Sequence, residues 1–225
     1  MGPQRVNARA RPPAVAGLFY PRDAAALRED ILRLLARAAA PLAAGSATEA
    51  AAADKAYIVP HAGYLYSGAV AAAAYARLQQ RHPRPHRVVL IGPSHHADFQ
   101  GLALPECEAF ATPLGAVAVD TDVCARLRHD PDIIRSDAAH QHEHCLEVQL
   151  PFLQVVLGAF TLVPLLTGRA ATTDVARVLE AAWGDVETIV VVSSDLSHYR
   201  AYAAARSLDA STAASIAART ELRDP

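Results

Sequence analysis

Short apolar runs alternate along this chain with longer segments in which apolar residues recur at helical spacing. Residues 88–91 are four consecutive apolar residues, most of them β-branched, and a Gly-Pro pair follows them. This pattern is typical of a central strand in a parallel sheet, buried on both faces. Three further runs, 55–59, 160–166 and 188–192, have the same character. Helical periodicity lies between them, so we predict a three-layer α/β/α domain with a largely parallel central sheet.

The remaining elements are predicted from capping and breaking residues. We expect helices over residues 24–40, 69–80, 122–128, 145–157, 174–183 and 201–218. Asp23 is a suitable N-cap for the first helix and Asp120 or Thr121 for the third. Pro151 predicts a kink or a break in the fourth. Pro41 is expected to end the first helix. Residues 110–113 and 116–119 are predicted to form a strand pair, 1–13 a loose arm and 42–54 an exposed linker.

Polar residues follow three of the predicted strands at their carboxyl ends. His61 follows the strand 55–59, His95 follows 88–91, and Asp195 and His198 follow 188–192. In open α/β sheets, ligands bind just beyond the carboxyl ends of the strands. The 34 residues that separate His61 from His95 correspond to one βαβ unit. We therefore predict that their two strands are neighbours in the sheet.

Two histidines from two strand ends are candidate metal ligands. Neutral imidazole is the commonest metal ligand in proteins, and a histidine pair suits iron, zinc, copper or manganese. The alternative is that His61 and His95 only form hydrogen bonds with loop backbone. Adjacent histidines rarely both bind one ion, so we expect His96, like Ser94, to line the pocket rather than join the ligand set.

Two further clusters carry candidate chemistry. Glu143 and His144 precede the helix 145–157. They belong either to a solvated loop or to a lid over the metal, with His144 as a donor and Glu143 as a base or as an orienting group for a ligand histidine. Asp195 and His198 have the spacing of an orienting and an acid/base group. A Ser194–His198 nucleophile pair is disfavoured because no G-x-S-x-G elbow is present.

Composition narrows the function classes. The chain has 225 residues, 52% of them hydrophobic, and a net charge of −2, which indicates a single globular domain over 1–225 without the basic surface of a nucleic-acid binder. No apolar run approaches the roughly 20 residues of a membrane span. The three cysteines, Cys107, Cys124 and Cys145, form no C-x-x-C motif, which favours a reducing, cytoplasmic location.

Several motifs together resemble one family. They are PAVAGLFYP near the start, PHAGYLYSG at 60–68, LIGPSHH at 90–96, ATPLG at 111–115, HEHCLEVQLPFLQ at 142–154 and VVSSDLSHY at 191–199. In this order they resemble the MEMO family, known in bacteria and archaea as AmmeMemoRadiSam system protein B. The resemblance implies the fold of the class III extradiol (LigB-type) dioxygenases, in which a non-haem Fe(II) lies at strand ends.

The resemblance also implies roles for individual residues. His61 and His95 match the metal-binding histidines of the family. Asp195 matches its pocket aspartate, and His198 its histidine at the position of the dioxygenase acid/base. Glu143 and His144 match its Glu-His pair before a helix. The third family ligand, a cysteine followed by glycine, would lie beyond Pro225, so we expect the C-terminus to be truncated relative to the family.

These implications leave two main functional hypotheses. The first is a metal-dependent, dioxygenase-like oxidoreductase that uses Fe(II), with copper or zinc as alternatives, on a small unknown substrate. The second is a non-catalytic binding or adaptor protein with AMMECR1-domain and radical SAM partners, as the family association implies. Eukaryotic members are described as adaptors for phosphotyrosine peptides. Zinc-dependent amide hydrolysis is disfavoured because the chain lacks an H-E-x-x-H motif.

Overall fold

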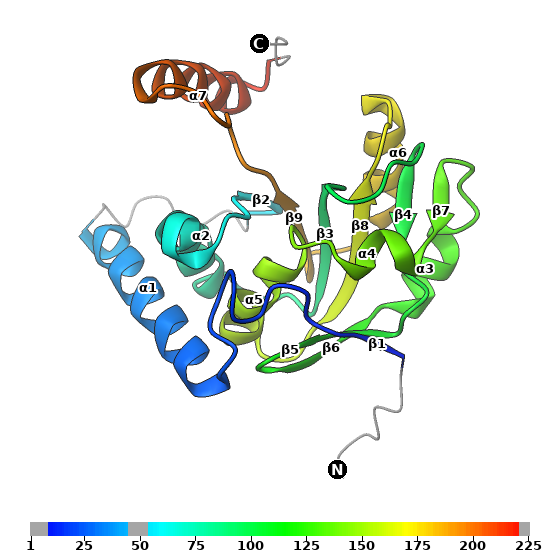
Figure 1. The fold of residues 1–225 in the computed structure, drawn as a ribbon, viewed down its shortest axis with the longest axis horizontal. Coiled ribbons are helices and arrows are strands. Elements are labelled where there is room, and N and C mark those ends of the chain that lie inside the picture. The colour runs from blue at the N-terminus through cyan, green and yellow to red at the C-terminus, as the bar shows by residue number, and fades with distance from the viewer. Residues whose placement is uncertain (1–8, 45–53, 221–225) are drawn as a thin grey trace. The chain divides into compact units, whose positions relative to one another are not determined.

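A computed structural model describes residues 9–44 and 54–220 of the chain (Figure 1). It divides after Ser194 into two compact units. The first unit contains the sheet and the candidate site, and the second contains one helix, α7 (Tyr202–Ala218). None of the described helices is long and apolar enough to cross a lipid bilayer. The single-domain interpretation of the whole chain stays a prediction.

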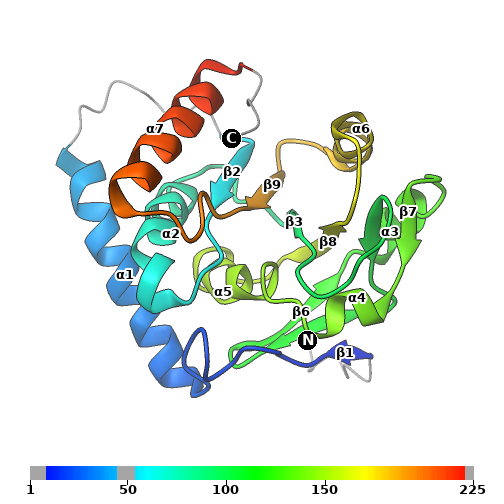
Figure 2. The ribbon, with the colours of Figure 1, turned by 45° about the horizontal axis from the view of Figure 1, so that its top comes forward.

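The first unit is built on one mixed, mostly parallel sheet. Its strands are β1 (Ala10–Arg11), β2 (Ala56–Val59), β3 (Arg87–Pro93), β4 (Leu102–Leu104), β5 (Ala109–Thr112), β6 (Gly115–Val119), β7 (Ile133–Arg135), β8 (Thr161–Thr167) and β9 (Thr188–Ser193). The main path runs β1-β5-β6-β8-β3-β9-β2, and β4 joins β8 and β7 beside it (Figure 2). Only the pairs β5–β6 and β4–β8 are antiparallel among the described strands.

Helices lie on both sides of this sheet, which confirms the predicted three-layer α/β fold. They are α1 (Ala24–Ala44), α2 (Tyr64–Gln79), α3 (Thr121–Leu127), α4 (Asp137–Gln141), the 3₁₀ turn η1 (Glu147–Gln149), α5 (Leu150–Leu157) and α6 (Thr172–Ala182). The helices α1, α2 and α5 pack against one another, and α3 contacts α6.

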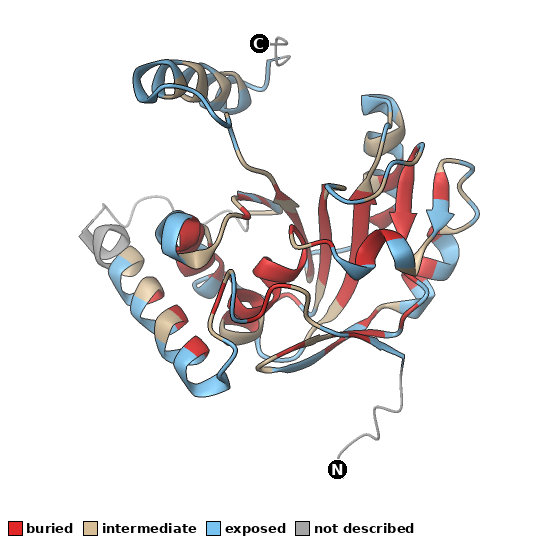
Figure 3. Cartoon of the chain, viewed as in Figure 1, coloured by how far each residue is buried: buried red, intermediate tan, exposed pale blue. Residues whose placement is uncertain are grey.

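The central strands β3, β8 and β9 are buried along most of their length (Figure 3). Residues 88–90 of β3 and 189–191 of β9 have at most 1% exposure. A parallel strand covered by helices on both sides has no solvent face, so its sequence is continuously apolar rather than alternating. This physical rule explains why the strand predictions at 88–91, 160–166 and 188–192 are confirmed.

The prediction that the strands before His61 and His95 are neighbours in the sheet is wrong. β2 and β3 do not pair, because β9 lies between them and forms parallel ladders with both. The intervening strand is contributed by residues more than 90 positions further along the chain than β3. A spacing of one βαβ unit cannot exclude such a later insertion.

Two helix boundaries also differ from the prediction. α2 begins at Tyr64 rather than at residue 69, and Gly68 lies inside it. A Cβ atom at Gly68 would be 3.0 Å from Cδ1 of Leu34, so glycine allows α1 and α2 to approach closely. α1 continues past Pro41 to Ala44. A proline in the last turn forgoes a single N–H···O bond and does not stop the flanking alanines.

The remaining predictions have mixed outcomes. The strand pair β5–β6 is confirmed, as are the Asp120 N-cap of α3, whose side chain accepts from the N–H of Val123, and the break at Pro151, at the start of α5. Residues 1–8 of the predicted arm and 45–53 of the predicted linker lie outside the described residues. Residues 9–13 are not loose, because β1 pairs with β5 and Arg11 is 6% exposed. The polar stretch 136–144 contains α4, a helix that was not predicted.

A buried ion pair joins the N-terminal segment, at Arg11, to Glu147 of η1. Nη1 of Arg11 donates to Glu147 at 2.7 Å, and neither side chain is more than 5% exposed. Glu147 also accepts hydrogen bonds from the backbone N–H groups of Ala14 and Val15 and from the Tyr20 hydroxyl. Burial and the Glu147 carboxylate raise the pKa of Tyr20 above its usual range. Hydrogen bonds to this one carboxylate therefore hold the segment 11–20 in place at four positions.

Glu147→Gln is expected to lower the free energy of unfolding by about 3–5 kcal/mol, because it leaves the Arg11 guanidinium buried without a counter-charge. Urea denaturation followed by far-ultraviolet circular dichroism measures this loss. The matched control is Asp30→Asn, which breaks the exposed pair with Arg33 and should cost no more than about 0.5 kcal/mol. Equal losses in the two variants would contradict the anchoring role of Glu147.

Candidate metal centre

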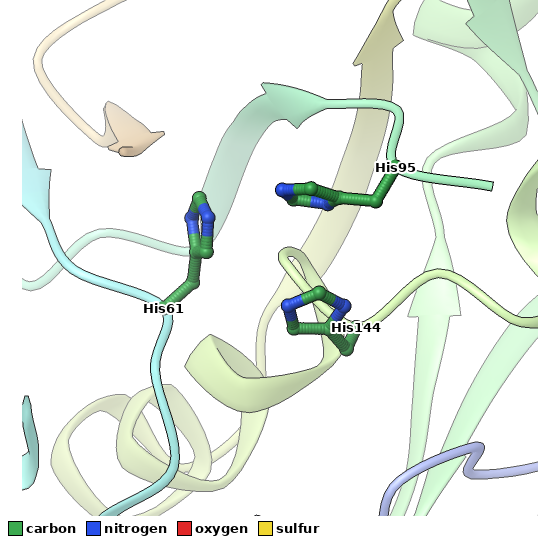
Figure 4. A group of neighbouring side chains, drawn as sticks. All are labelled: His61, His95 and His144. Atoms are coloured by element: carbon green, nitrogen blue, oxygen red, sulfur yellow. The ribbon is translucent and has the colours of Figure 1, made fainter. Parts of the chain in front are cut away.

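Three histidines from separate parts of the chain converge beyond the carboxyl ends of β2 and β3 (Figure 4). His61 follows β2, His95 follows β3, and His144 precedes η1. The ring centroids are 5.2 Å apart for His61 and His95, 5.7 Å for His61 and His144, and 4.7 Å for His95 and His144. One ring nitrogen from each histidine lies within 4.8 Å of the other two.

The exit of β3 sets the direction of His95. The Ser94 N–H donates to the Thr167 carbonyl at 2.9 Å, which continues the ladder with β8. The Ser94 hydroxyl then donates to the Ala97 carbonyl at 2.8 Å and accepts from the Ala97 N–H at 3.2 Å, which closes a tight turn around His95. A Cβ at Gly92 would lie 2.7 Å from Sγ of Cys145. Glycine at that position therefore lets the segment that carries His144 approach the strand.

The carboxylate of Glu143 joins the two segments. Its Oε2 accepts from the backbone N–H of His95 at 2.6 Å, and its Oε1 accepts from the N–H groups of His144 at 2.8 Å and Cys145 at 3.0 Å. Nδ1 of His95 lies 2.9 Å from Oε1, and Nδ1 of His144 lies 3.3 Å from the same oxygen. Glu143 is 2% exposed, so these contacts replace its hydration.

The ionised form of Glu143 fixes the protons on both rings. Burial raises the pKa of this carboxyl, but the hydrogen bonds from His144, His95 and Cys145 outweigh it and hold the pKa well below its usual range. An ionised carboxylate only accepts, so the Nδ1 atoms of His95 and His144 carry hydrogen. In the neutral imidazole the lone pair is then on Nε2, the nitrogen that would bind a metal.

The proton of His61 is fixed in the same way by a neutral group. The Ser193 hydroxyl at the end of β9 donates to the Cys145 carbonyl at 2.6 Å and accepts from the Gln149 amide at 2.9 Å. Its remaining lone pair faces Nδ1 of His61 at 3.1 Å, so this nitrogen carries hydrogen. Nε2 is again the nitrogen with the lone pair. All three imidazoles are thus held in the same tautomer.

The donor set fits a late divalent transition metal. Imidazole nitrogen suits zinc, copper, iron and nickel, and two ligands about 2.0–2.1 Å from one ion are at most about 4.2 Å apart. The observed limit of 4.8 Å between the ring nitrogens is close to this value. A second group, His95, Glu143 and Cys145, fits less well. Sγ of Cys145 donates to the Pro93 carbonyl at 3.0 Å, and burial together with Glu143 raises the pKa of this thiol.

The other residues singled out in the sequence have different positions. Ser94, His95 and His96 line an open cleft of about 500 Å³. His96 is exposed on this cleft, with its ring centroid 6.2 Å from that of His144. In the second unit, Nε2 of His198 lies 3.5 Å from Oδ2 of Asp195. Cys107, Cys124 and Cys145 are all buried and free.

Sequence reasoning missed two supporting residues, Ser193 and Gln149. Ser193, the last residue of β9, contacts Cys145 and His61, both far away in the sequence. Gln149 also donates to the Pro60 carbonyl at 2.9 Å and accepts from the Tyr75 hydroxyl at 2.8 Å. A polar residue at the last position of an apolar strand was the one available signal for Ser193.

Fold and site together define a three-layer α/β protein with a histidine cluster beyond the carboxyl ends of its strands. The family model described as Memo-like protein matches residues 11–222. A MEMO1 family protein of Ignicoccus hospitalis is 40% identical over 202 residues, which cover 84% of this chain and 69% of the relative. A MEMO1 family protein of Aquifex aeolicus is 35% identical, over 85% of this chain and 68% of the relative. The chain belongs to the Memo-like family.

A fourth histidine beside the site has a structural role. His140 is 1% exposed, and its Nε2 lies 3.2 Å from the Ala103 carbonyl, while its own carbonyl accepts from Nε of Arg11 at 2.6 Å. Burial lowers the pKa of His140 to about 4. Its imidazole is therefore neutral in the folded protein at pH values where the same imidazole is already protonated in the unfolded chain.

This difference predicts acid sensitivity. Between pH 6.5 and pH 4 the unfolded state binds a proton at residue 140 that the folded state does not, so stability falls as the pH falls. Replacing His140→Gln should reduce that fall by up to about 3 kcal/mol. Urea midpoints between pH 7 and pH 4 measure it, with His129→Gln, at an exposed histidine, for comparison. An unchanged pH dependence in His140→Gln would show that residue 140 is not the source.

Proposed function

We propose that this protein binds one divalent transition metal through the Nε2 atoms of His61, His95 and His144, and that Fe(II) is the working ion. The observation that carries the proposal is the convergence of three imidazoles whose Nδ1 protons are all engaged by neighbouring groups. Random surface histidines lack such orienting partners, whereas metal-binding histidines almost always have them. Copper and zinc are the alternatives that imidazole donors also suit.

The protein's own groups supply orientation and charge. Glu143 holds two of the rings and places a full negative charge beside them, which favours a cation at their Nε2 atoms. Ser193 holds the third ring without adding charge. Fe(II), when bound, would supply open coordination positions for a small organic substrate and O₂. The side chain of His95 is 37% exposed, so a substrate can reach this side of the cluster.

We further propose that His198 transfers a proton to or from the substrate and that Asp195 orients its ring. The family resemblance and the Asp195–His198 contact of 3.5 Å support this assignment. Both residues follow β9 directly along the chain. The histidine side chain can both donate and accept a proton, which suits acid/base catalysis.

Metal content is the first test. Wild-type protein purified without oxygen should contain about one metal ion per chain by inductively coupled plasma mass spectrometry. His95→Ala and His144→Ala should lose it, because each removes one imidazole donor. Glu143→Gln should weaken metal affinity by roughly 10–100-fold, because the rings lose their orienting charge.

The matched control is His96→Ala, which removes the exposed histidine next to His95 and should retain the metal. If His95→Ala and wild type held the same amount of metal, the proposed ligand set would be wrong. Which element is found decides between iron, copper and zinc.

His198→Ala separates proton transfer from metal binding. The variant should keep the wild-type metal content but lower O₂ uptake with a catechol by about 10²–10⁴-fold, the usual contribution of a general acid or base. An oxygen electrode measures the uptake. Loss of metal in this variant would instead identify His198 as a ligand, and unchanged uptake would remove it from the mechanism.

A binding role is the second candidate function. Leu65, Tyr66 and Val70 of α2 are 87%, 81% and 64% exposed, and Leu18 is 81% exposed. Apolar side chains of this size, gathered on a surface, often mark contacts with other proteins. We propose AMMECR1-domain and radical SAM proteins as partners, on the family association. Partner binding that survives in His95→Ala but is lost in Tyr66→Ser would favour this role.

A further inference from the structure

The cleft beside the histidine cluster has a second wall that the metal proposal does not use. It lies between the turn after β3, residues 93–98, and the end of β8, residues 167–169, and has a volume of about 500 Å³. Ligand sites commonly have volumes of about 300–1,000 Å³. Its lining includes His95 and His96 from the turn and Arg169 from the end of β8. A molecule held at the histidine cluster on this side would therefore meet an arginine.

The backbone of Arg169 is fixed from both directions. Its N–H donates to the Phe99 carbonyl at 2.8 Å, and its carbonyl accepts from the Gly101 N–H at 2.9 Å. Gly168 before it makes this possible, because a Cβ there would lie 2.2 Å from the Phe99 carbonyl oxygen. The close approach of the two segments thus requires glycine at position 168, and it determines where Arg169 leaves the backbone.

The side chain is held as well. With its amide oriented to satisfy both groups, Gln100 accepts from Nε of Arg169 at 3.0 Å and donates to the Arg169 carbonyl at 3.1 Å. Nη2 lies 3.0 Å from Oδ2 of Asp98, which is itself 70% exposed. These contacts engage two of the five guanidinium N–H groups and leave the others to a ligand. An ion pair as exposed as this one contributes little, so a ligand can replace Asp98.

We propose that Arg169 forms an anion subsite of the cleft, which recognises a carboxylate or phosphate group on the ligand that binds at His95. The inference rests on the proposed function for the identity of that ligand, but the subsite itself needs only the residues of the cleft. The guanidinium fork matches a two-oxygen anion, and Gln100 pre-orients it so that little freedom is lost on binding. The substrate class is then a small organic anion rather than a neutral compound.

Anion titration of the full chain tests the subsite. Benzoate and inorganic phosphate are added separately to the protein as purified and after chelator treatment, and amide shifts of residues 94–98 and 167–169 are followed by ¹H–¹⁵N nuclear magnetic resonance. A saturable shift is expected in both preparations. The anion that binds with the higher affinity shows whether the cleft recognises a carboxylate or a phosphate group.

Three variants of the cleft and one control variant outside it are compared. Arg169→Gln should weaken anion binding at least about 10-fold, and Asp98→Asn should tighten it by about 3-fold, because it removes the competing carboxylate. Arg135→Gln is the matched control, since Arg135 is a 53% exposed arginine paired with Glu106 at 3.0 Å outside the cleft. Arg169→Lys, which keeps the charge without the fork, should be intermediate and covers the case in which Arg169→Gln fails to fold.

Equal affinities in wild type, Arg169→Gln and Arg169→Lys would overturn the subsite, and so would the absence of a saturable shift. Because chelator-treated protein is included, this failure differs from failure of the proposed function, which appears as metal content unchanged by His95→Ala. If the protein bound the anion but no metal, the proposal of an anion subsite would stand and the proposal of a metal site would be rejected.

Discussion

The buried carboxylate of Glu143 is the interaction on which the site depends. It is 2% exposed and ionised, so it must receive hydrogen bonds in place of water. It obtains them from the backbone N–H groups of His95, His144 and Cys145 and from the Nδ1 atom of His95, which lie on two segments far apart along the chain. Satisfying one charge therefore forces the exit of β3 and the entry to η1 into fixed positions. The orientation of two imidazoles follows from this electrostatic requirement.

A second buried carboxylate supports the same segment from the other side. Glu147, four residues after Glu143, binds Arg11, and Arg11 in turn donates to the carbonyls of His140 and Glu143. The N-terminal segment is thus not an appendage but part of the support of the site. The two acidic residues have separate tasks. Glu143 positions the imidazoles, and Glu147 holds the backbone that carries Glu143.

The three imidazoles share a tautomer although their partners differ. Glu143 provides a full negative charge to His95 and His144, and Ser193 provides a neutral acceptor to His61. A cation at the Nε2 atoms would therefore be balanced on one side of the cluster only. The adjoining cleft is lined by His95 and His96 and also by Asp98 and Arg169, which form an ion pair. The proposed anion subsite would exchange the Asp98 carboxylate for an anionic group on the ligand.

The sequence by itself determined the layers of the fold and the ends at which chemistry gathers. Continuous apolar runs identify buried parallel strands such as β3, because a strand covered on both faces has no polar side. His61 and His95 were found as residues that follow two of the predicted strands. Glu143 and His144 were also singled out, but a solvated loop remained an alternative to a position beside the metal. Only the tertiary structure decided that β9 separates β2 from β3, and that Ser193 and Gln149 orient His61. These contacts join residues that are distant along the chain. Strand order and long-range side-chain hydrogen bonds produce no local periodicity in the sequence, so they could not be predicted from it.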